Sequence, residues 1–384
     1  MKKWIVILYI FIYFLIILGF SVYSYTQVDL NLTISSNTLY QSFQQPMLQL
    51  GYFNRPLSAS LYVFFLILLF LFYIFMLKLT LKDGILNKKL IICLIILNIG
   101  AALISYPAFS HDFFNYMFDA RIVTLYHQNP YFYKALDYPG DLWIRFMHWT
   151  HRTYPYGPLW LIATLPFSYL GMGKFVATLV LFKMMFVIVY LLNIILIYKI
   201  AGSLNRNSAL KGIVFFAINP LIITETLISP HNESLMLLFL LLSVYYLFSN
   251  KNYIFSLISL IASVLIKFVT VPLLPLFLIK RIRTDYQIFL KSAILLLFIP
   301  LFVEIYNREA YPWYFIPLLG INSLLSNSWI LGVSIALSLG AMLRYVPFLY
   351  TGDYNLANYR LMNLFLILPI LIYSVPTLYA KFKT

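Results

Sequence analysis

Apolar stretches long enough to cross a membrane recur from one end of the chain to the other, with short polar segments between them. At 1.5 Å of rise per residue, a helix of about 17 to 25 apolar residues crosses a hydrocarbon layer of about 30 Å. The pattern therefore predicts an all-α integral membrane protein with about 12 transmembrane helices. We expect these helices near residues 4–25, 58–78, 88–107, 174–199, 212–229, 233–249, 253–266, 268–280, 287–303, 312–325, 328–346 and 361–379.

Two apolar segments need a separate interpretation. Residues 158–171 span about 14 residues and contain Pro166, which favours an interfacial or re-entrant helix over a crossing. Residues 253–280 lie between two basic clusters, so they predict a short hairpin with Lys267 near its outer turn.

Composition agrees with the membrane class, since 62% of the 384 residues are hydrophobic and 10% are charged. A soluble domain has about 25% charged residues. The net charge of +15 would suggest nucleic acid in a soluble protein, but here the basic residues lie between spans, so no nucleic-acid partner is expected. The single cysteine, Cys93, excludes an internal disulfide.

The basic residues also predict the orientation, because lysine and arginine favour the cytoplasmic side of short loops. Both termini are then cytoplasmic, and the first apolar stretch is a retained span rather than a signal peptide. The clusters placed inside are Lys2/Lys3, Lys78/Lys82/Lys88/Lys89, Lys199/Arg206/Lys211, Lys251, Lys280/Arg281/Arg283 and Lys381/Lys383. Most acidic residues then fall outside, which indicates a functional outer face.

The chain reads as one integrated membrane domain in three segments. Residues 1–107 hold the first helices and the first outer loop, 108–173 form a large outer loop, and 174–384 hold the remaining helices. Within the large loop, residues 110–126 predict an amphipathic helix in the headgroup layer, with acids on one face and phenylalanines on the other.

The large loop carries the first candidates for chemistry. Asp112 lies where the chain leaves a span, which suits either a functional carboxylate or a helix cap, and His111 precedes it. Asp119 and Arg121 suit binding of sugar hydroxyls and phosphate, or an ordinary solvated face. Tyr154 and Tyr156 suit a wall against a sugar ring or an aromatic belt at the membrane interface.

Further candidates come from the second half of the chain. Pro230-His231-Asn232-Glu233 fills a tight outer turn with Glu225 nearby, which favours a substrate or acid–base role over a plain connection. No HExxH or Cys/His pattern predicts a metal, and a divalent site would need ligands from several loops. Lys267 interrupts an apolar run and needs an anion, unless it snorkels to the surface. Arg308, Arg344 and Arg360 are further outer cations.

Several short motifs follow one another in a recognisable order. They are Ser110-His111-Asp112, Asp119-Ala120-Arg121, Asn129-Pro130-Tyr131, Tyr156-Gly157-Pro158-Leu159-Trp160, His231-Asn232-Glu233, Ile266-Lys267-Phe268, Pro312-Trp313-Tyr314 and Arg344-Tyr345-Val346-Pro347. On these motifs the chain resembles the GT-C class of membrane glycosyltransferases, in particular the bacterial and archaeal mannosyltransferase-like members.

This resemblance implies transfer of a mannose-like hexose, with inversion, from a polyprenyl-phosphate carrier to a glycan, lipid or protein acceptor outside a prokaryotic plasma membrane. It implies an acidic base early in the large loop, Asp112 or the next acid, Asp119. The sequence predicts no cofactor and leaves a divalent cation as an open alternative. The donor phosphate is expected on Lys267, Arg121 and Arg344. The substrate is expected on His111, Tyr154, Tyr156, His231, Asn232, Glu233, Trp313 and Tyr314. Two extra spans before the loop depart from the class pattern.

Other functions fit a chain with these helices. A transporter or flippase of lipid-linked sugars would place its polar groups near the midplane on broken helices, whereas here they gather at one predicted surface. An acyl- or phosphotransferase acting on the same lipids is a second alternative. A purely structural scaffold role is the least favoured alternative, because it does not account for the acidic and basic residues on the predicted outer face.

Overall fold

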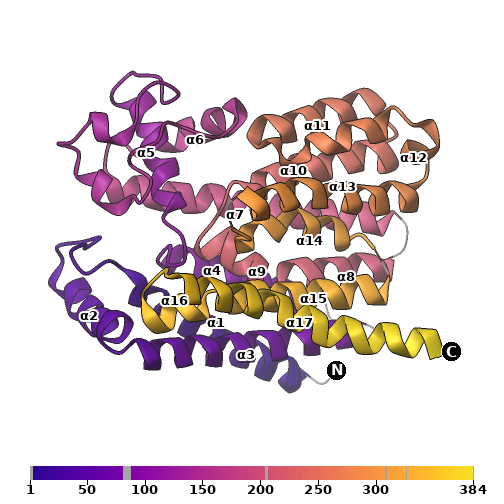
Figure 1. The fold of residues 1–384 in the computed structure, drawn as a ribbon, viewed down its shortest axis with the longest axis horizontal. Helices are drawn as coiled ribbons and strands as arrows, with labels where there is room; N and C mark the ends of the chain where they lie inside the picture. The colour runs from indigo at the N-terminus through magenta and orange to yellow at the C-terminus, as the bar shows by residue number, and fades with distance from the viewer. Residues whose placement is uncertain (1–2, 81–87, 204–205, 308, 326, 384) are drawn as a thin grey trace.

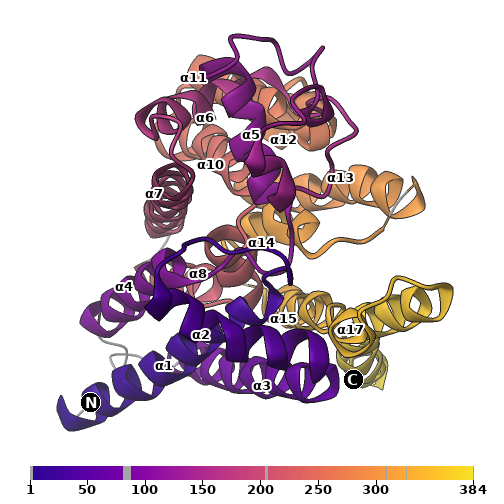
Figure 2. The same cartoon turned by 90° about the vertical axis from the view of Figure 1, so that its left-hand side faces the viewer.

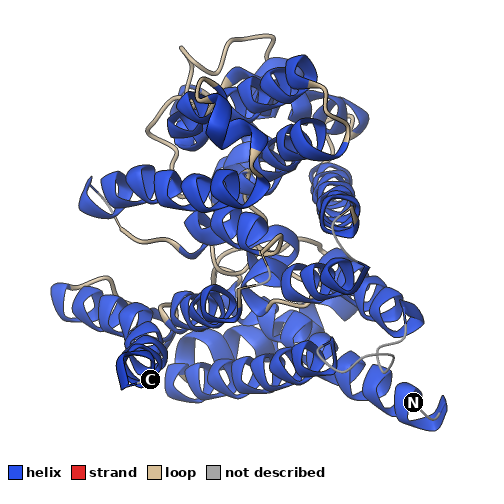
Figure 3. Cartoon of the chain, turned by 90° about the vertical axis from the view of Figure 1, so that its right-hand side faces the viewer, coloured by secondary structure: helices blue, strands red, loops and turns tan. Residues whose placement is uncertain are grey.

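The structure is a computed structural model that describes residues 3–80, 88–203, 206–307, 309–325 and 327–383. Every regular element in these ranges is helical (Figure 3). The elements, with η marking 3-10 and π turns, are α1 (Lys3–Tyr23), η1 (Ser24–Gln27), α2 (Thr38–Leu48), η2 (Gln49–Phe53), α3 (Arg55–Thr80), α4 (Lys88–Ile104), α5 (Asp112–Thr124), η3 (Ala135–Asp137), η4 (Leu142–Phe146), α6 (Pro158–Leu170), α7 (Phe175–Gly202), α8 (Arg206–Ala217), α9 (Pro220–Ile223), η5 (Thr224–Ile228), α10 (Glu233–Val244), η6 (Tyr245–Ser249), α11 (Tyr253–Ile266), η7 (Phe268–Phe277), α12 (Lys280–Thr284), α13 (Tyr286–Asn307), η8 (Pro312–Phe315), α14 (Ile316–Asn322), α15 (Ser328–Leu343), α16 (Val346–Thr351) and α17 (Leu356–Lys383). Lys2, Lys82 and Arg308, to which the sequence assigned a side of the membrane, lie outside the described residues.

The helices form two groups that pack on each other (Figure 1, Figure 2). In one group α1 packs on α3 and α4, α3 on α8 and α16, and α15 on α17. In the other α5 packs on α6, α10 on α11 and α14, and η7 on α13. Helix α7 joins the groups through α4, α8 and α10.

The two ends of the helix bundle differ. Figure 1 shows both chain termini and α12 at one end, and α2, α5 and the loop after α5 at the other. The termini and the basic segment Lys280–Thr284 therefore share an end, and the candidate loops lie at the opposite end.

Among the residues that the structure describes, six helices are long and apolar enough to cross a membrane, or seven if a pair bent by 54° counts as one span. The chain is a multi-pass membrane protein, but the expected twelve spans are not confirmed. The remaining predicted spans coincide with shorter helices. The hairpin at 253–280 shows why, since α11 ends at Ile266 and the following turns are interrupted by Pro272 and Pro275, which cannot continue an α-helical hydrogen-bond ladder.

The predicted loop helices are present as α5 and α6, but α5 does not lie at the surface as the prediction of an amphipathic helix in the headgroup layer required. Ten of its residues are buried, from Asp112 to Ile122, on all sides of the helix. The reason is that α6, η4 and α7 pack around it, so its acids lie inside protein.

Lys183 is a buried lysine in α7 that the sequence analysis did not single out. Its Nζ donates to the carbonyl oxygen of Ala102 at 2.6 Å, to the carbonyl of Ser105 and to the Ser105 hydroxyl at 3.2 Å. The last carbonyls of a helix have no partner within the helix, so the ammonium group satisfies the end of α4 and is itself satisfied.

Candidate active site

The two acids of α5 point to the same side of the helix. Asp112 and Asp119 are seven positions apart, about two full turns, and each residue is 9% exposed. Asn115, between them, donates from its side chain to the carbonyl oxygen of Trp149 at 3.2 Å. The side of α5 that faces the loop after η4 therefore carries a carboxylate, an amide and a second carboxylate, from Asp112, Asn115 and Asp119.

A cation from that loop faces these acids, and sequence reasoning missed it. Nη2 of Arg152 lies 4.0 Å from Oδ1 of Asp112, and its guanidinium covers the ring of Trp149 at 4.8 Å. The Arg152 side chain keeps 29% of its surface exposed. The signal in the sequence was an arginine in the large loop two positions before Tyr154.

Asp119 differs from an ordinary surface acid. Burial, opposed by the charge of Arg152 and reinforced by that of Asp112, raises the pKa of Asp119 to about 8. At neutral pH this carboxyl group therefore holds its proton, and in this form it is able to donate a hydrogen bond.

The turn at 154–158 is docked against the end of α11. Gly157 donates its N–H to the carbonyl oxygen of Ile266 at 3.0 Å, and a Cβ at Gly157 would lie 2.0 Å from the carbonyl oxygen of Leu265. The Tyr154 hydroxyl closes the turn by donating to the Gly157 carbonyl at 2.9 Å. Only glycine permits this approach, which places Tyr156 beside the next residue of the hairpin, Lys267.

Lys267 lies in the break between α11 and η7, where the sequence predicted the outer turn. Its Nζ forms an ion pair with the carboxylate of Glu233 and lies 5.1 and 5.9 Å from the ring centroids of Tyr314 and Tyr156. The anion that Lys267 was expected to need is therefore a residue of the protein. A small pocket adjoins the pair, lined by Glu233, Val269, Leu297, Pro300, Leu301, Glu304, Tyr314, Pro317 and Leu318.

The start of α10 brings further buried polar groups to the same place. Nδ1 of His231 lies 3.1 Å from Oε2 of Glu225, whose Oε1 accepts a hydrogen bond from the hydroxyl of Tyr345 at 2.8 Å. The imidazole of His231 stacks on Trp313 at 4.0 Å, and Trp313 stacks on Tyr311 at 4.5 Å. The three rings form a layered aromatic wall.

Several polar atoms at this point have no hydrogen-bond partner among the described residues. They are both side-chain amide atoms of Asn232, Nε2 of His231 and Oε2 of Glu233, all on residues that are at most 1% exposed. Buried polar atoms are almost always paired, so this group indicates a place for a polar ligand.

Arg344 borders the aromatic wall but is already paired. Its Nη2 contacts the carboxylate of Glu309, and its guanidinium carbon lies 5.3 Å from the ring centroid of Tyr311. The charge of Asp112 also contributes to the raised pKa of Tyr311, after burial, the charge of Glu309, the opposing charge of Arg344 and the charge of Tyr359, so Asp112 lies within electrostatic reach of the ring beside Arg344.

Arg121 lies outside this cluster, in contrast to the expected phosphate role. It is nine positions after Asp112, which places it on about the opposite side of the helix. Its Nε donates to Oδ2 of Asp141 at 2.6 Å, Nη1 to the carbonyl of Gly173 at 3.3 Å, and its guanidinium covers Trp143 at 4.1 Å. These contacts tie α5 to the segment around η4 and to the turn that precedes α7.

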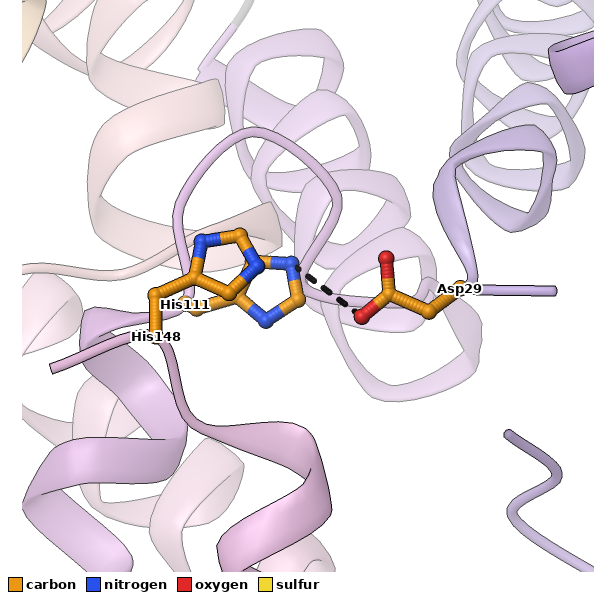
Figure 4. A group of neighbouring side chains, drawn as sticks. All are labelled: Asp29, His111 and His148. Carbon is orange, nitrogen blue, oxygen red and sulfur yellow. Dashed lines mark ion pairs between the residues drawn. The ribbon is translucent and has the colours of Figure 1, made fainter. Parts of the chain in front are cut away.

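His111 is also turned away from the sugar-binding candidates. Its Nδ1 is 2.8 Å from the carbonyl oxygen of Phe146, and it gathers with Asp29 and His148 in a neighbouring cluster (Figure 4). The other predicted residues gather at the end of the bundle that holds α2, α5 and the loop after α5, which we call the loop-rich end. They are Asp112, Asp119, Tyr154, Tyr156, His231, Asn232, Glu233, Lys267, Trp313, Tyr314 and Arg344.

Comparison with known proteins gives one family. The family model described as alpha-(1->6)-mannopyranosyltransferase, N-terminal domain, matches residues 21–283. This range includes α5, the Tyr156 turn, the start of α10 and Lys267, whereas Trp313, Tyr314 and Arg344 follow it. No curated protein and no solved structure gives a significant match to the chain.

Proposed function

We propose that this chain, which belongs to the MptA_B family of alpha-(1->6)-mannopyranosyltransferases, takes its mannosyl group from a polyprenyl-phosphate carrier and transfers it, with inversion, to an acceptor hydroxyl outside the membrane. Family membership makes the chain a glycosyltransferase with a sugar donor and an acceptor. The carrier, the inverting displacement, the base and the membrane face are the additions made here.

The observation that carries the proposal is the set of unpaired polar atoms on Asn232, His231 and Glu233. A sugar ring offers hydroxyls that both donate and accept hydrogen bonds, as an amide, an imidazole and a carboxylate require. The stacked rings of His231 and Trp313 give the flat apolar surface that a sugar face covers. A purely lipid ligand would leave these polar atoms unpaired.

Asp112 is the proposed general base. It takes the proton of the acceptor hydroxyl while that oxygen forms a bond to the anomeric carbon from the side opposite the leaving phosphate. The bond from the anomeric carbon to the phosphate oxygen breaks, and the lipid phosphate leaves with the electron pair. Asp119 is less suited, because its pKa of about 8 keeps it protonated at neutral pH, where it instead donates a hydrogen bond.

Positive charge stabilises the leaving phosphate, as in other phosphate sites. Arg152 is the best placed cation, since its nearest carboxylate oxygen is 4.0 Å away. Lys267 and Arg344 are each in closer contact with a carboxylate, so they exchange part of that pairing for the phosphate. Arg121 has no part in this step.

An apolar pocket beside the polar cluster is the proposed contact for the lipid tail of the donor. The pocket beside Lys267 is lined mainly by side chains of η7, α13 and α14, such as Val269, Leu297 and Leu318, and it touches Glu233 and Tyr314 of the polar cluster. In the proposal the loop-rich end faces outside a prokaryotic plasma membrane, the termini lie inside, and the short helices complete twelve crossings.

The experiment is a donor comparison with protein reconstituted in vesicles. Radiolabelled mannose is supplied either on polyprenyl phosphate or on a nucleotide diphosphate, with a mannose oligosaccharide as acceptor. We expect label to move from the lipid donor alone and the new linkage to have the opposite anomeric configuration. Equal transfer from the nucleotide donor contradicts the carrier, and a retained configuration contradicts the displacement. Asn232→Ala, which removes one unpaired amide, should lower transfer from the lipid donor.

A further inference from the structure

We propose that Asp29, His111 and His148 form a binding site for one divalent transition-metal ion of the zinc type. The three residues come from different segments: the loop after η1, the residue before α5 and the loop after η4. One ligand atom from each lies within 4.8 Å of the other two, and Figure 4 shows the Asp29 carboxylate directed at the His111 ring. The inference does not depend on the transfer reaction.

His111 is set up as a ligand by its other nitrogen. A carbonyl oxygen accepts only, so the 2.8 Å contact with Phe146 places the ring proton on Nδ1 of a neutral His111. The free lone pair is then on Nε2, which is 4.0 Å from Oδ2 of Asp29. Metal-bound histidines usually donate their second nitrogen to a carbonyl or carboxylate in this way.

Asp29 is held in the same manner. Its Oδ1 accepts a hydrogen bond from the hydroxyl of Tyr52 at 3.0 Å, which leaves Oδ2 directed at His111. The separation of 4.0 Å between Oδ2 and Nε2 is too long for a hydrogen bond. It suits two ligands of one ion, because metal–ligand distances of about 2.0 to 2.2 Å put neighbouring ligand atoms about 3 to 4 Å apart.

His148 completes the set after a ring rotation. Its imidazole stacks on His111 with centroids 3.6 Å apart and planes inclined by 12°, and two parallel rings do not both aim at a common ion. The side chain is exposed, so rotation about its side-chain bonds meets little resistance. The Asp29 side chain is 36% exposed, which leaves water access to a fourth position.

The ligand set selects the class of ion. Two imidazoles and one carboxylate suit zinc and its neighbours, whereas magnesium and calcium prefer oxygen ligands only. A bound ion would fasten the first outer loop to the residue before Asp112, and so fix the start of α5.

The test uses tag-free, full-length protein in detergent, treated with a chelator, dialysed, and titrated with zinc chloride by calorimetry. We expect one Zn²⁺ per chain and a metal-dependent rise in Tm. Asp29→Asn, which keeps an acceptor for Tyr52, and His148→Ala should each weaken binding at least about tenfold. His151→Ala, an exposed histidine of the same loop, is the matched control and should bind as the original protein does.

The results of this titration either support or overturn the metal site. Binding by the original protein and the control, lost in Asp29→Asn and His148→Ala with metal-free Tm unchanged, supports the site. If the original protein takes up no Zn²⁺, or if both variants bind as tightly as it does, the proposal is overturned. Cobalt(II) in place of zinc gives a second readout, because its visible absorption band should appear in the original protein and disappear in both variants.

Discussion

Helix α5 carries an ion pair toward each of its ends, and the two pairs are built differently. Arg121 and Asp141 are 2.6 Å apart, and Tyr126 and the carbonyl of Gly173 take up further hydrogen bonds. Asp112 and Arg152 are 4.0 Å apart. We call Arg121–Asp141 the closed pair, because it is in direct hydrogen-bond contact and has further partners, and Asp112–Arg152 the open pair. A closed pair stabilises the fold, while an open pair can exchange its partner for a substrate. The comparison separates structural from reactive charge within one helix.

The largest expected effect comes from the open pair. Asp112→Asn keeps the size of the side chain but removes the base, so transfer should fall by about 10² to 10⁴ with unchanged Tm. Turnover of the reconstituted variant is compared with that of Asp137→Asn, an exposed acid of the same loop whose loss should matter little. Near-normal turnover in Asp112→Asn would break the comparison.

Breaking the closed pair, Arg121–Asp141, should lower the stability of the protein rather than its activity. Asp141→Asn leaves the guanidinium of Arg121, whose side chain is 13% exposed, without its counter-charge, at a cost of about 3 to 5 kcal/mol. Thermal unfolding in detergent should show a clear drop in Tm, while the protein that remains folded keeps its affinity for the donor. A raised donor KM with unchanged Tm would instead assign the pair to the substrate.

Arg152→Gln tests the other half of the open pair. Loss of a charged contact worth about 1.5 to 3 kcal/mol should raise the donor KM by about one to two orders of magnitude and leave the acceptor KM nearly unchanged. The steady-state constants for both substrates distinguish this from a general defect. Arg145→Gln, which alters an exposed arginine of the same loop, serves as the control and should leave both constants in place.

The smallest effect at neutral pH is expected for Asp119→Asn, because the pKa of about 8 already keeps Asp119 neutral. Above about pH 8 the original protein gains a second negative charge beside Asp112, so its affinity for the anionic donor should fall, whereas Asp119→Asn should lack that fall. The folded-state pKa lies above the unfolded value, so the stabilisation from the neutral carboxyl is full below about pH 4 and is lost as the pH rises to about 8. Identical pH profiles would contradict this assignment.

The sequence predicted the order of helices well, because long apolar runs and basic loops are local signals. It also predicted that Asp112, His231 and Lys267 would share one end, since each follows or precedes an apolar run on the same predicted side. It grouped Arg121 with Asp119 because the two are close in the chain, whereas Arg121 lies on another side of the helix and contacts Asp141 and Trp143. It missed Arg152 and the Asp29–His111–His148 cluster because irregular loops have no periodicity from which a contact can be derived.

The carboxylate partner of Lys267 shows a second limit. The sequence required an anion for the ammonium group, but it could not choose between a lipid phosphate and Glu233, which lies 34 positions earlier in the chain. Only the packing of α10 against α11 makes that choice. The glycine at 157 was visible as part of a motif, yet its reason, close contact with Leu265, depends on the same packing.

The buried ammonium of Lys183 sets an order for biogenesis. A lone lysine at the centre of an inserting helix costs about 2.5 to 3.5 kcal/mol on translocon scales. Here the compensating carbonyls belong to Ala102 of α4 and to Ser105 just after it, which are synthesised earlier. We therefore expect α7 to partition into lipid efficiently only when the end of α4 is already inserted next to it, so that Lys183 can donate to its carbonyls. Expressing residues 108–384 without the first segment should lower insertion of α7, as glycosylation mapping of its flanks would reveal.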